Sequence, residues 1–263
     1  MRLTILQPTL VWENPVANRE NFAQQLAPLR GQTDLVLLPE MFTTGFSMNA
    51  AALAEPMDGP TMQWLRQTAD ELGAAVAGSF ICEDGGRFFN RLVFMRPGGA
   101  LDFYDKKHLF SLAGEPNYFT GGKKRLTLEW RGWRICPLIC YDLRFPVWSR
   151  NAPGSFAGRM EPLYDLLLYV ANWPARRAHH WRSLLMARAI ENQAYVAGAN
   201  IVGTDGNGLD YAGDSALIDY SGAIIFEQNG QEALLTAELS LENLRQYRLQ
   251  LPFLQDGDVF HFR

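Results

Sequence analysis

Three largely apolar runs in this sequence, each the length of one strand, end at a polar side chain that can take part in chemistry. They are residues 35–38, before Glu40; residues 133–139, before Cys140; and residues 166–170, before Asn172. Continuous apolar runs are typical of strands covered on both faces, so they predict an α/β fold with helices outside the sheet. Ligands in open α/β sheets collect outside the carboxyl ends of the strands. We therefore expect Glu40, Cys140 and Asn172 to share one crevice.

The rest of the chain alternates strands with helices. Apolar side chains recur at helical spacing in segments 15–29, 60–72, 176–192 and 241–249. Further strands are expected at 3–6, 74–81, 88–95, 101–104, 126–130, 195–202, 215–219, 223–227 and 233–239. The sequence contains no linker, repeat or low-complexity segment. We therefore expect one domain over residues 1–263, with an extended tail from about residue 250.

Composition and charge argue against two classes of partner. The 263 residues carry a formal net charge of −4 with no basic arm or stripe, which argues against a nucleic-acid partner. No apolar run approaches the roughly 20 residues of a membrane span. Gln7 and Pro8 interrupt the N-terminal apolar segment before a signal-peptide core could form. Because three cysteines fit a reducing compartment better than a disulfide framework, we expect a cytoplasmic protein with no membrane partner.

The position of Cys140 alone supports two interpretations. A thiol where a buried strand ends can be held rigidly and still face a pocket, as a nucleophile requires. Alternatively, Cys140 is a small, inert core residue, as many free cysteines are. Cys136 and Cys140 lie four residues apart on a strand, without metal-site spacing or a second ligand cluster. We therefore expect no metal and no other cofactor.

Glu40 and Lys106 also have simpler interpretations. A glutamate after a strand is usually a solvated loop residue, and Lys106-Lys107 is typical of a charged turn. Lys106 nevertheless follows the short strand at 101–104, which could bring its amine to the same rim as Glu40 and Cys140. From the residues alone, a thiol, a carboxylate and an amine could converge, and the pattern specifies no reaction.

Four motifs, in order along the chain, make the pattern specific. They are L-L-P-E-M-F-T-T-G-F, Y-D-K-K-H-L-F, G-E-P-N-Y-F-T-G-G and I-C-Y-D-L-R-F-P. Together with the later segments A-N-W-P-A-R-R, A-R-A-I-E-N-Q-A-Y-V-A-G-A-N and G-T-D-G-N-G, they resemble the motif set of the nitrilase (carbon–nitrogen hydrolase) superfamily. The resemblance extends from Leu3 to about Phe226. It implies a four-layer α-β-β-α sandwich and at least a homodimer.

The resemblance also implies a role for each residue that matches a motif. Glu40 matches the general base, Lys106 the catalytic lysine and Cys140 the nucleophile. Glu115 matches a second glutamate near the lysine and the substrate, and the backbone N–H of Tyr141 matches an oxyanion donor.

Neighbouring residues receive supporting roles in this interpretation. Lys106 lies two residues before His108, as the superfamily lysine does, so we do not expect Lys107 to be catalytic. We expect His108 to support the lysine loop, and Asp142 and Arg144 to brace the turn of the nucleophile.

The chemistry accounts for these residue types. A thiol near its usual pKa is mostly protonated at neutral pH, so it needs a nearby base or cation. Glu40 would take the thiol proton, deliver it to departing ammonia and then activate a water. Lys106 would stabilise the oxyanion of each tetrahedral intermediate, and the intermediate between them would be a thioester on Cys140.

Within the superfamily, the motifs look most like those of omega-amidases. This branch hydrolyses the terminal amide of 2-oxo-dicarboxylic monoamides, such as 2-oxoglutaramate and 2-oxosuccinamate, and releases ammonia. Three alternatives remain: an N-carbamoyl amidase, a nitrilase proper, and a non-catalytic scaffold with the same fold. The last is disfavoured because a scaffold has no use for the full set of matched residues.

A substrate with a carboxylate should meet a cation in the pocket. Arg144, Arg176 and Arg177 are available, although for each alone we favour surface solvation or a structural ion pair. Trp173 is the best candidate for a pocket wall, and its alternative is a core aromatic residue.

Overall fold

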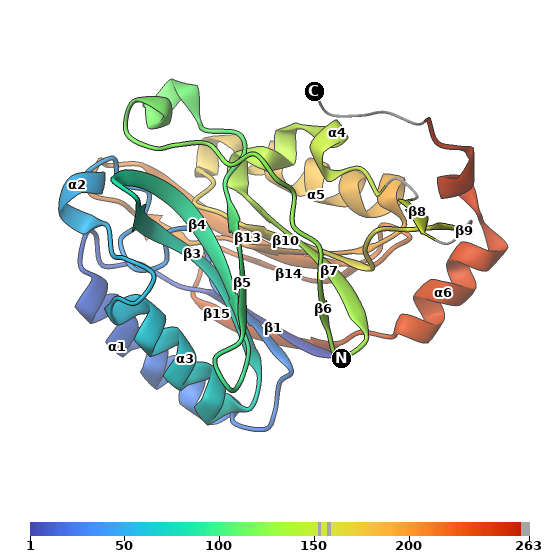
Figure 1. Ribbon diagram of the computed structural model, residues 1–263, viewed down its shortest axis with the longest axis horizontal. Helices are drawn as coiled ribbons and strands as arrows, with labels where there is room; N and C mark the ends of the chain where they lie inside the picture. The colour runs from blue at the N-terminus through green and yellow to red at the C-terminus, as the bar shows by residue number, and fades with distance from the viewer. Residues whose placement is uncertain (152–153, 157–158, 259–263) are drawn as a thin grey trace.

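Two β-sheets face each other, and helices cover the outer side of each (Figure 1). The computed structural model describes residues 1–151, 154–156 and 159–258. Helices α1 (Pro15–Leu26) and α3 (Pro60–Leu72) cover one sheet, and α5 (Ala178–Asn192) covers the other. The order of the layers is therefore α-β-β-α, as the family resemblance implied.

The first sheet has parallel strands at its centre and antiparallel strands at its edges. Its order is β15 (Ala233–Glu238), β1 (Arg2–Gln7), β2 (Leu35–Leu37), β3 (Ala75–Asp84), β4 (Arg87–Met95) and β5 (Leu101–Asp105). Strands β1, β2 and β3 are parallel, whereas β3–β4 and β4–β5 are antiparallel pairs. Strand β5 therefore runs in the same direction as β2, and their carboxyl ends lie at the same edge of the sheet.

The second sheet repeats this arrangement. Its order is β12 (Val202–Thr204), β13 (Asp210–Ile218), β11 (Tyr195–Ala199), β10 (Leu166–Val170), β7 (Trp133–Ile139) and β6 (Leu128–Trp130), with β14 (Ile224–Asn229) paired to β13. Strands β7, β10 and β11 are parallel. A separate two-stranded sheet joins β8 (Gly154–Phe156) and β9 (Arg159–Glu161).

Three shorter helices complete the described fold. They are α2 (Ala50–Leu53), α4 (Pro146–Ser149) and α6 (Leu241–Gln250). The tail expected from about residue 250 contains one 3₁₀ turn, Phe253–Asp256, whose Leu254 is buried. Residues 259–263 of that predicted tail lie outside the described residues.

The alternation of side chains along β2 shows why these strands are apolar throughout. Leu35 and Leu37 pack into the core between the two sheets, whereas Val36 and Leu38 pack against the helices α1 and α3. Because successive side chains point to opposite faces of a strand, a sheet covered on both faces needs an apolar residue at every position. The second sheet has the same character, since β10 is buried at all five positions.

Two of the differences from the sequence-based expectation have a clear physical reason. The strand expected over residues 195–202 is broken at Asn200, whose side chain accepts from the N–H of Trp173 and donates to the carbonyl of Gly213. These bonds draw the backbone out of the sheet between β11 and β12. The helix expected from residue 176 begins at Ala178, because residues 175–177 form a 3₁₀ turn that includes Arg176 and Arg177.

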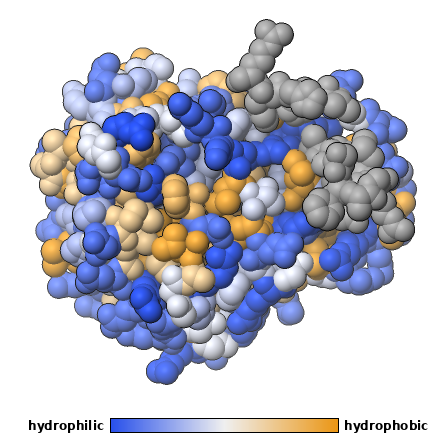
Figure 2. Space-filling view, viewed as in Figure 1, coloured by the Kyte–Doolittle hydropathy of each residue, from blue (hydrophilic) through white to orange (hydrophobic). Residues whose placement is uncertain are grey.

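On the face shown in Figure 2, hydrophilic side chains surround a group of apolar side chains that lies across the middle. Edge strand β5 crosses this face in the same view (Figure 1), and its Leu101 and Phe103 are exposed. The guanidinium of Arg91 lies 4.1 Å from the centre of the Phe103 ring and partly covers it.

Gly78 on β3 allows the segment that carries Glu40 to pack closely on the sheet. A methyl group at this position would lie 2.8 Å from Cβ of Leu38 and 3.0 Å from Cδ1 of Phe42. We expect Gly78→Ala to lower the free energy of unfolding by about 1–3 kcal/mol, as overpacking of a core does. Urea unfolding measures this loss. Because Phe42→Leu makes room for the methyl group, the double variant should lose less stability than the sum of the single variants. Strictly additive losses would contradict the packing explanation.

Candidate active site

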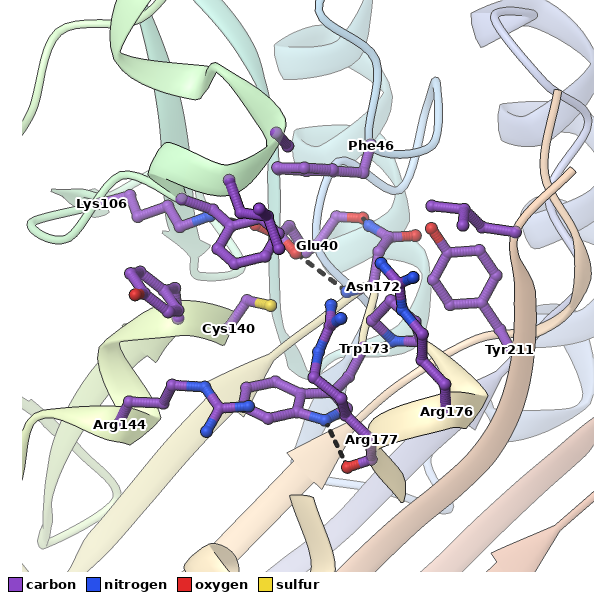
Figure 3. Close-up of a pocket in the computed structure, with 16 residues that line it drawn as sticks. Glu40, Phe46, Lys106, Cys140, Arg144, Asn172, Trp173, Arg176, Arg177 and Tyr211 are labelled. Carbon is purple, nitrogen blue, oxygen red and sulfur yellow. Dashed lines mark hydrogen bonds and ion pairs between the residues drawn. The ribbon is translucent and has the colours of Figure 1, made fainter. Parts of the chain in front are cut away.

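The four side chains that follow strands β2, β5, β7 and β10 meet at one pocket. Glu40, Lys106, Cys140 and Asn172 all line it (Figure 3), and its cavity measures about 200 Å³. The crevice expected from the polar ends of the apolar runs is therefore present. It lies where the two sheets bring the carboxyl ends of their central strands together.

The Glu40 carboxylate is completely buried and held by three donors. Oε1 accepts from Nζ of Lys106 and from Nδ2 of Asn90, each at 2.8 Å, and Oε2 accepts from the backbone N–H of Asn172 at 2.9 Å. The Asn172 side chain also donates to the Glu40 carbonyl at 2.6 Å. The solvated-loop interpretation of Glu40 is therefore wrong.

Lys106 is buried between two carboxylates. Its Nζ lies 2.8 Å from Oε1 of Glu40 and 3.0 Å from Oε2 of Glu115. Burial alone would lower the pKa of Lys106, but the charges of Glu115 and Glu40 outweigh burial and raise it. The lysine therefore carries its positive charge inside the protein, and the charged-turn interpretation is wrong for this residue.

Glu115 begins a 3₁₀ turn, Glu115–Asn117, in the long loop after β5. Its Oε2 accepts a hydrogen bond from the backbone N–H of Phe110, which fixes the carboxylate beside the lysine. Burial raises the pKa of Glu115, and the ammonium of Lys106 opposes that effect.

The side chains of Lys106 and Lys107 point in different directions. Lys107 does not line the pocket, and its Nζ lies 5.4 Å from the centre of the Trp148 ring. The structure thus brings Lys106, and not Lys107, to Glu40 and Cys140.

Cys140 begins the 3₁₀ turn Cys140–Arg144 directly after β7, and its backbone φ is +42°. Met41, the residue after Glu40, has the same φ. Positive φ is unfavourable for residues with a Cβ and persists where the surrounding structure enforces it, often at functional sites. The turn at Met41 directs the preceding side chain, Glu40, toward the pocket. The turn that begins at Cys140 directs the Cys140 side chain toward it (Figure 3).

The thiol of Cys140 is protonated in this environment. Burial and the negative charge of Glu40 raise its pKa well above the usual value, against the lowering effect of Lys106. A group that can take the proton must therefore act when the sulfur attacks, and Glu40 is the carboxylate in contact with the thiol.

Asp142 ties the nucleophile turn to the lysine loop. Its carboxylate accepts from the backbone N–H groups of Ile139 and His108, from Nδ1 of His108 at 2.7 Å and from the Tyr104 hydroxyl at 2.8 Å. The placement of His108 and Asp142 therefore agrees with the bracing positions expected from the sequence.

Three arginines line the outer part of the pocket; Arg144 and Arg177 are half-buried, whereas Arg176 is exposed, as the surface interpretation expects. Arg176 and Arg177 extend toward Asn172 and Cys140, whereas Arg144 lies along the Trp173 ring (Figure 3). The Arg144 guanidinium is 4.7 Å from the ring centre, and Nη2 lies 3.1 Å from Nδ1 of His180. Within the described residues, none of the three forms an ion pair with a carboxylate. Burial lowers the pKa of Arg177, and the charges of Arg176 and Arg144 add to that effect.

Trp173 is both a wall of the pocket and a core aromatic residue, the two interpretations that the sequence allowed. It lines the pocket, and it also belongs to the hydrophobic core, with its ring centre 5.4 Å from that of Trp181 on α5. Its indole N–H donates to the carbonyl of Arg177 at 2.8 Å and thereby fixes the turn that carries the arginines.

Sequence reasoning missed Asn90, Phe46 and Tyr211. Asn90 interrupts the apolar strand β4, and that interruption was an available signal. Phe46 and Tyr211 line the pocket from a loop and from β13. Phe46 ends the motif around Glu40, which was an available signal, whereas Tyr211 lies in none of the quoted motifs.

The described residues contain neither a metal-binding cluster nor a membrane-spanning helix. No group of three or more histidine, cysteine or acidic side chains in this part of the chain is arranged to hold a metal ion. No helix among the described residues has the length and apolar character to cross a membrane.

Comparison with known proteins gives a consistent result. The family model described as carbon-nitrogen hydrolase matches residues 2–249. The chain is 48% identical to omega-amidase YafV of Escherichia coli (strain K12), over 99% of this chain and 98% of the relative. It is 34% identical to 2-oxoglutaramate amidase of Bacillus subtilis (strain 168), over 85% and 84%.

Solved structures agree with these relatives. XC1258 from Xanthomonas campestris, a CN-hydrolase superfamily protein with an arsenic adduct in its active site, has a TM-score of 0.97 and 47% identity, over 100% of this chain and 99% of that one. An amidase from Nesterenkonia sp. AN1, in which acrylamide has added to the active-site cysteine, has a TM-score of 0.80 and 25% identity, over 96% and 98%.

The three cysteines should differ sharply in reactivity toward iodoacetamide. Cys82 and Cys136 have no exposed surface, and burial raises their pKa values to about 11 and about 12. Cys140 faces the pocket beside a base, so we expect it alone to be alkylated in the folded protein. Peptide mass spectrometry identifies the labelled residue, and Cys140→Ala should incorporate no label. Labelling of Cys82 or Cys136 as fast as Cys140 would contradict this assignment.

Proposed function

Because this chain belongs to the carbon–nitrogen hydrolase family, we propose that it is an omega-amidase for 2-oxo-dicarboxylic monoamides such as 2-oxoglutaramate. The chain is an amidohydrolase with a cysteine nucleophile. One observation carries the finer proposal: a thiol, a base and an ammonium meet at the floor of a pocket whose outer part holds three arginines without carboxylate partners among the described residues.

The proposed reaction begins with attack by Sγ of Cys140 on the carbonyl carbon of the terminal amide. Glu40 takes the thiol proton as the carbon–sulfur bond forms, which the raised pKa of Cys140 requires. The carbonyl oxygen becomes an oxyanion, and the Lys106 ammonium stabilises it.

The backbone N–H of Tyr141 is the second proposed oxyanion donor. Tyr141 lies in the first turn of the 3₁₀ segment Cys140–Arg144, where N–H groups have no acceptor within the helix. Loss of one oxyanion donor typically lowers the rate by about a hundredfold to a thousandfold.

Two further steps complete the proposed cycle. The carbon–nitrogen bond breaks as Glu40 returns its proton to the nitrogen, and ammonia leaves a thioester on Cys140. A water then attacks the thioester while Glu40 accepts one of its protons. The carbon–sulfur bond breaks, the acid product leaves and Glu40 reprotonates the thiolate.

The arginines support a substrate that carries a carboxylate. Arg144, Arg176 and Arg177 repel one another, as the lowered pKa of Arg177 indicates, and an anion in the pocket relieves that repulsion. Guanidinium groups match carboxylates in geometry and charge. In the proposed complex the 2-oxo acid end lies at the arginines and the amide end at Cys140.

The arginines distinguish only some of the alternatives. A nitrile without an acid group would leave the guanidiniums unpaired, so a nitrilase proper is disfavoured. An N-carbamoyl amino acid also carries a carboxylate, so an N-carbamoyl amidase remains the second candidate. The homodimer and the cytoplasmic location expected from the sequence stay predictions.

Ammonia release from 2-oxoglutaramate and 2-oxosuccinamate tests the proposed activity. We expect turnover by the wild type and none by Cys140→Ala, which lacks the nucleophile. An N-carbamoyl amino acid and a nitrile serve as comparison substrates. A folded wild type that cleaves the carbamoyl substrate but neither 2-oxo amide would overturn the omega-amidase assignment and leave the family assignment intact.

Arg177→Gln should raise KM for 2-oxoglutaramate about tenfold to a hundredfold, because a hydrogen bond to a charged group contributes roughly 1.5–3 kcal/mol. Arg177→Lys retains the charge and should lose less. Arg182→Gln is the matched control, since Arg182 lies outside this pocket and pairs with Glu227. An equal KM increase for a neutral amide without a carboxylate would contradict recognition of the acid group.

A further inference from the structure

Asn90 contacts each of the three charged residues that are buried together, Glu40, Lys106 and Glu115. Its Nδ2 lies 2.8 Å from Oε1 of Glu40 and 3.5 Å from Oε1 of Glu115. Its backbone carbonyl accepts the N–H of Lys106 at 3.0 Å. The side chain has no exposed surface, and on β4 it lies between Phe89 and Arg91, which are both buried.

The orientation of the Asn90 amide follows from these contacts. Were it turned over, Oδ1 would face the two carboxylates, and three acceptors would be opposed with no proton between them. In the observed orientation Nδ2 donates, but Oδ1 is buried with no partner among the described residues. An unpaired buried acceptor is unfavourable. An apolar side chain would avoid that cost, so the benefit of asparagine here lies in its N–H donor.

The net charge of Glu40, Lys106 and Glu115 explains why the Asn90 donor is a neutral group. Two carboxylates, Glu40 and Glu115, face a single ammonium, Lys106. A second cation would bring the net charge of the three residues to zero and hold Glu40 less ready to accept a proton. An amide N–H stabilises the ionised carboxylate without changing the charge.

We propose that Asn90 is a positioning residue that keeps the Glu40 carboxylate ionised and oriented to accept the Cys140 proton. This inference rests on the roles proposed above for Glu40 and Cys140. Asn90 itself does not line the pocket, so it acts through Glu40 and not on the substrate.

The groups that face Glu40 set the direction of the expected pH effect. They are Lys106 after β5, Glu115 in its 3₁₀ turn, Cys140 after β7, the Asn172 N–H after β10 and the Tyr211 phenol on β13. The Asn90 N–H stabilises the charged form of the carboxylate, so its removal leaves that form less favoured. A base works only when deprotonated, so the acid limb of activity should move to higher pH.

Asn90→Leu removes the donor at similar size, and Asn90→Ser retains a hydroxyl donor. We expect the midpoint of the acid limb to rise by about one pH unit or more in Asn90→Leu and by less in Asn90→Ser. Two profiles are measured: kcat/KM for 2-oxoglutaramate, and the rate of Cys140 alkylation by iodoacetamide. Because alkylation does not depend on which amide is the substrate, it tests Asn90 even if the proposed substrate is wrong.

Asn192→Leu is the matched control. Asn192 is an equally buried asparagine in α5, and its side chain bonds to the Asn151 N–H and the Arg188 carbonyl, away from the pocket. Its loss should lower the melting temperature and leave the alkylation midpoint unchanged. If Asn90→Leu does not fold, the shift of the acid-limb midpoint in Asn90→Ser tests the proposal. An unchanged midpoint in the folded Asn90 variants would overturn the proposal and leave Asn90 a packing residue.

Discussion

The Lys106 ammonium lies between two carboxylates that have no contact with solvent, and the rest of the site is arranged around that ion triplet. A buried charge is stable only when it is paired and hydrogen-bonded, and removal of one partner typically costs about 3–5 kcal/mol. Glu40 comes from one end of the first sheet, Lys106 from its edge strand and Glu115 from the loop beyond. The triplet therefore ties the loop that carries Glu115 to the sheet that positions Glu40 and Lys106.

Because of this ion triplet, the thiol of Cys140 is uncharged before the reaction begins. The cluster already contains one more carboxylate than ammonium, so a thiolate at Cys140 would add a second unbalanced negative charge in a poorly solvated place. That excess, together with burial, is why the pKa of Cys140 is raised and not lowered. Under the proposed mechanism the proton leaves sulfur only as the new bond forms, and the negative charge passes directly to an oxyanion beside Lys106.

The sequence predicted those parts of the fold that depend on local pattern. Every position of β2 and β10 is apolar because both faces are covered, and that made these strands visible. Gly73 ends α3 in the left-handed conformation for which glycine is suited, so that boundary was also predictable. The motifs around Glu40, Lys106 and Cys140 located residues that the structure brings together.

What sequence could not predict depends on contacts between distant segments. The break at Asn200 exists because its side chain bonds to Trp173 and Gly213, and no local pattern encodes those partners. Arg176 and Arg177 sit in a turn fixed by the Trp173 indole, so their direction follows from tertiary structure alone. Asn90 was visible as a polar residue in a strand, but its partners on Glu40 and Glu115 lie 50 and 25 residues away.

The charges of the pocket also define how a substrate would enter it. The floor carries the buried carboxylates and the thiol, whereas the outer part carries three guanidiniums. An acid group is repelled by the floor and attracted by the outer part, and a neutral amide meets no such opposition. A molecule with a carboxylate at one end and an amide at the other is therefore oriented before it reaches Cys140. Under the proposed function, discrimination among such molecules would depend on the length of chain between the two ends, because the arginines and Cys140 would hold those ends at fixed places in a cavity of about 200 Å³.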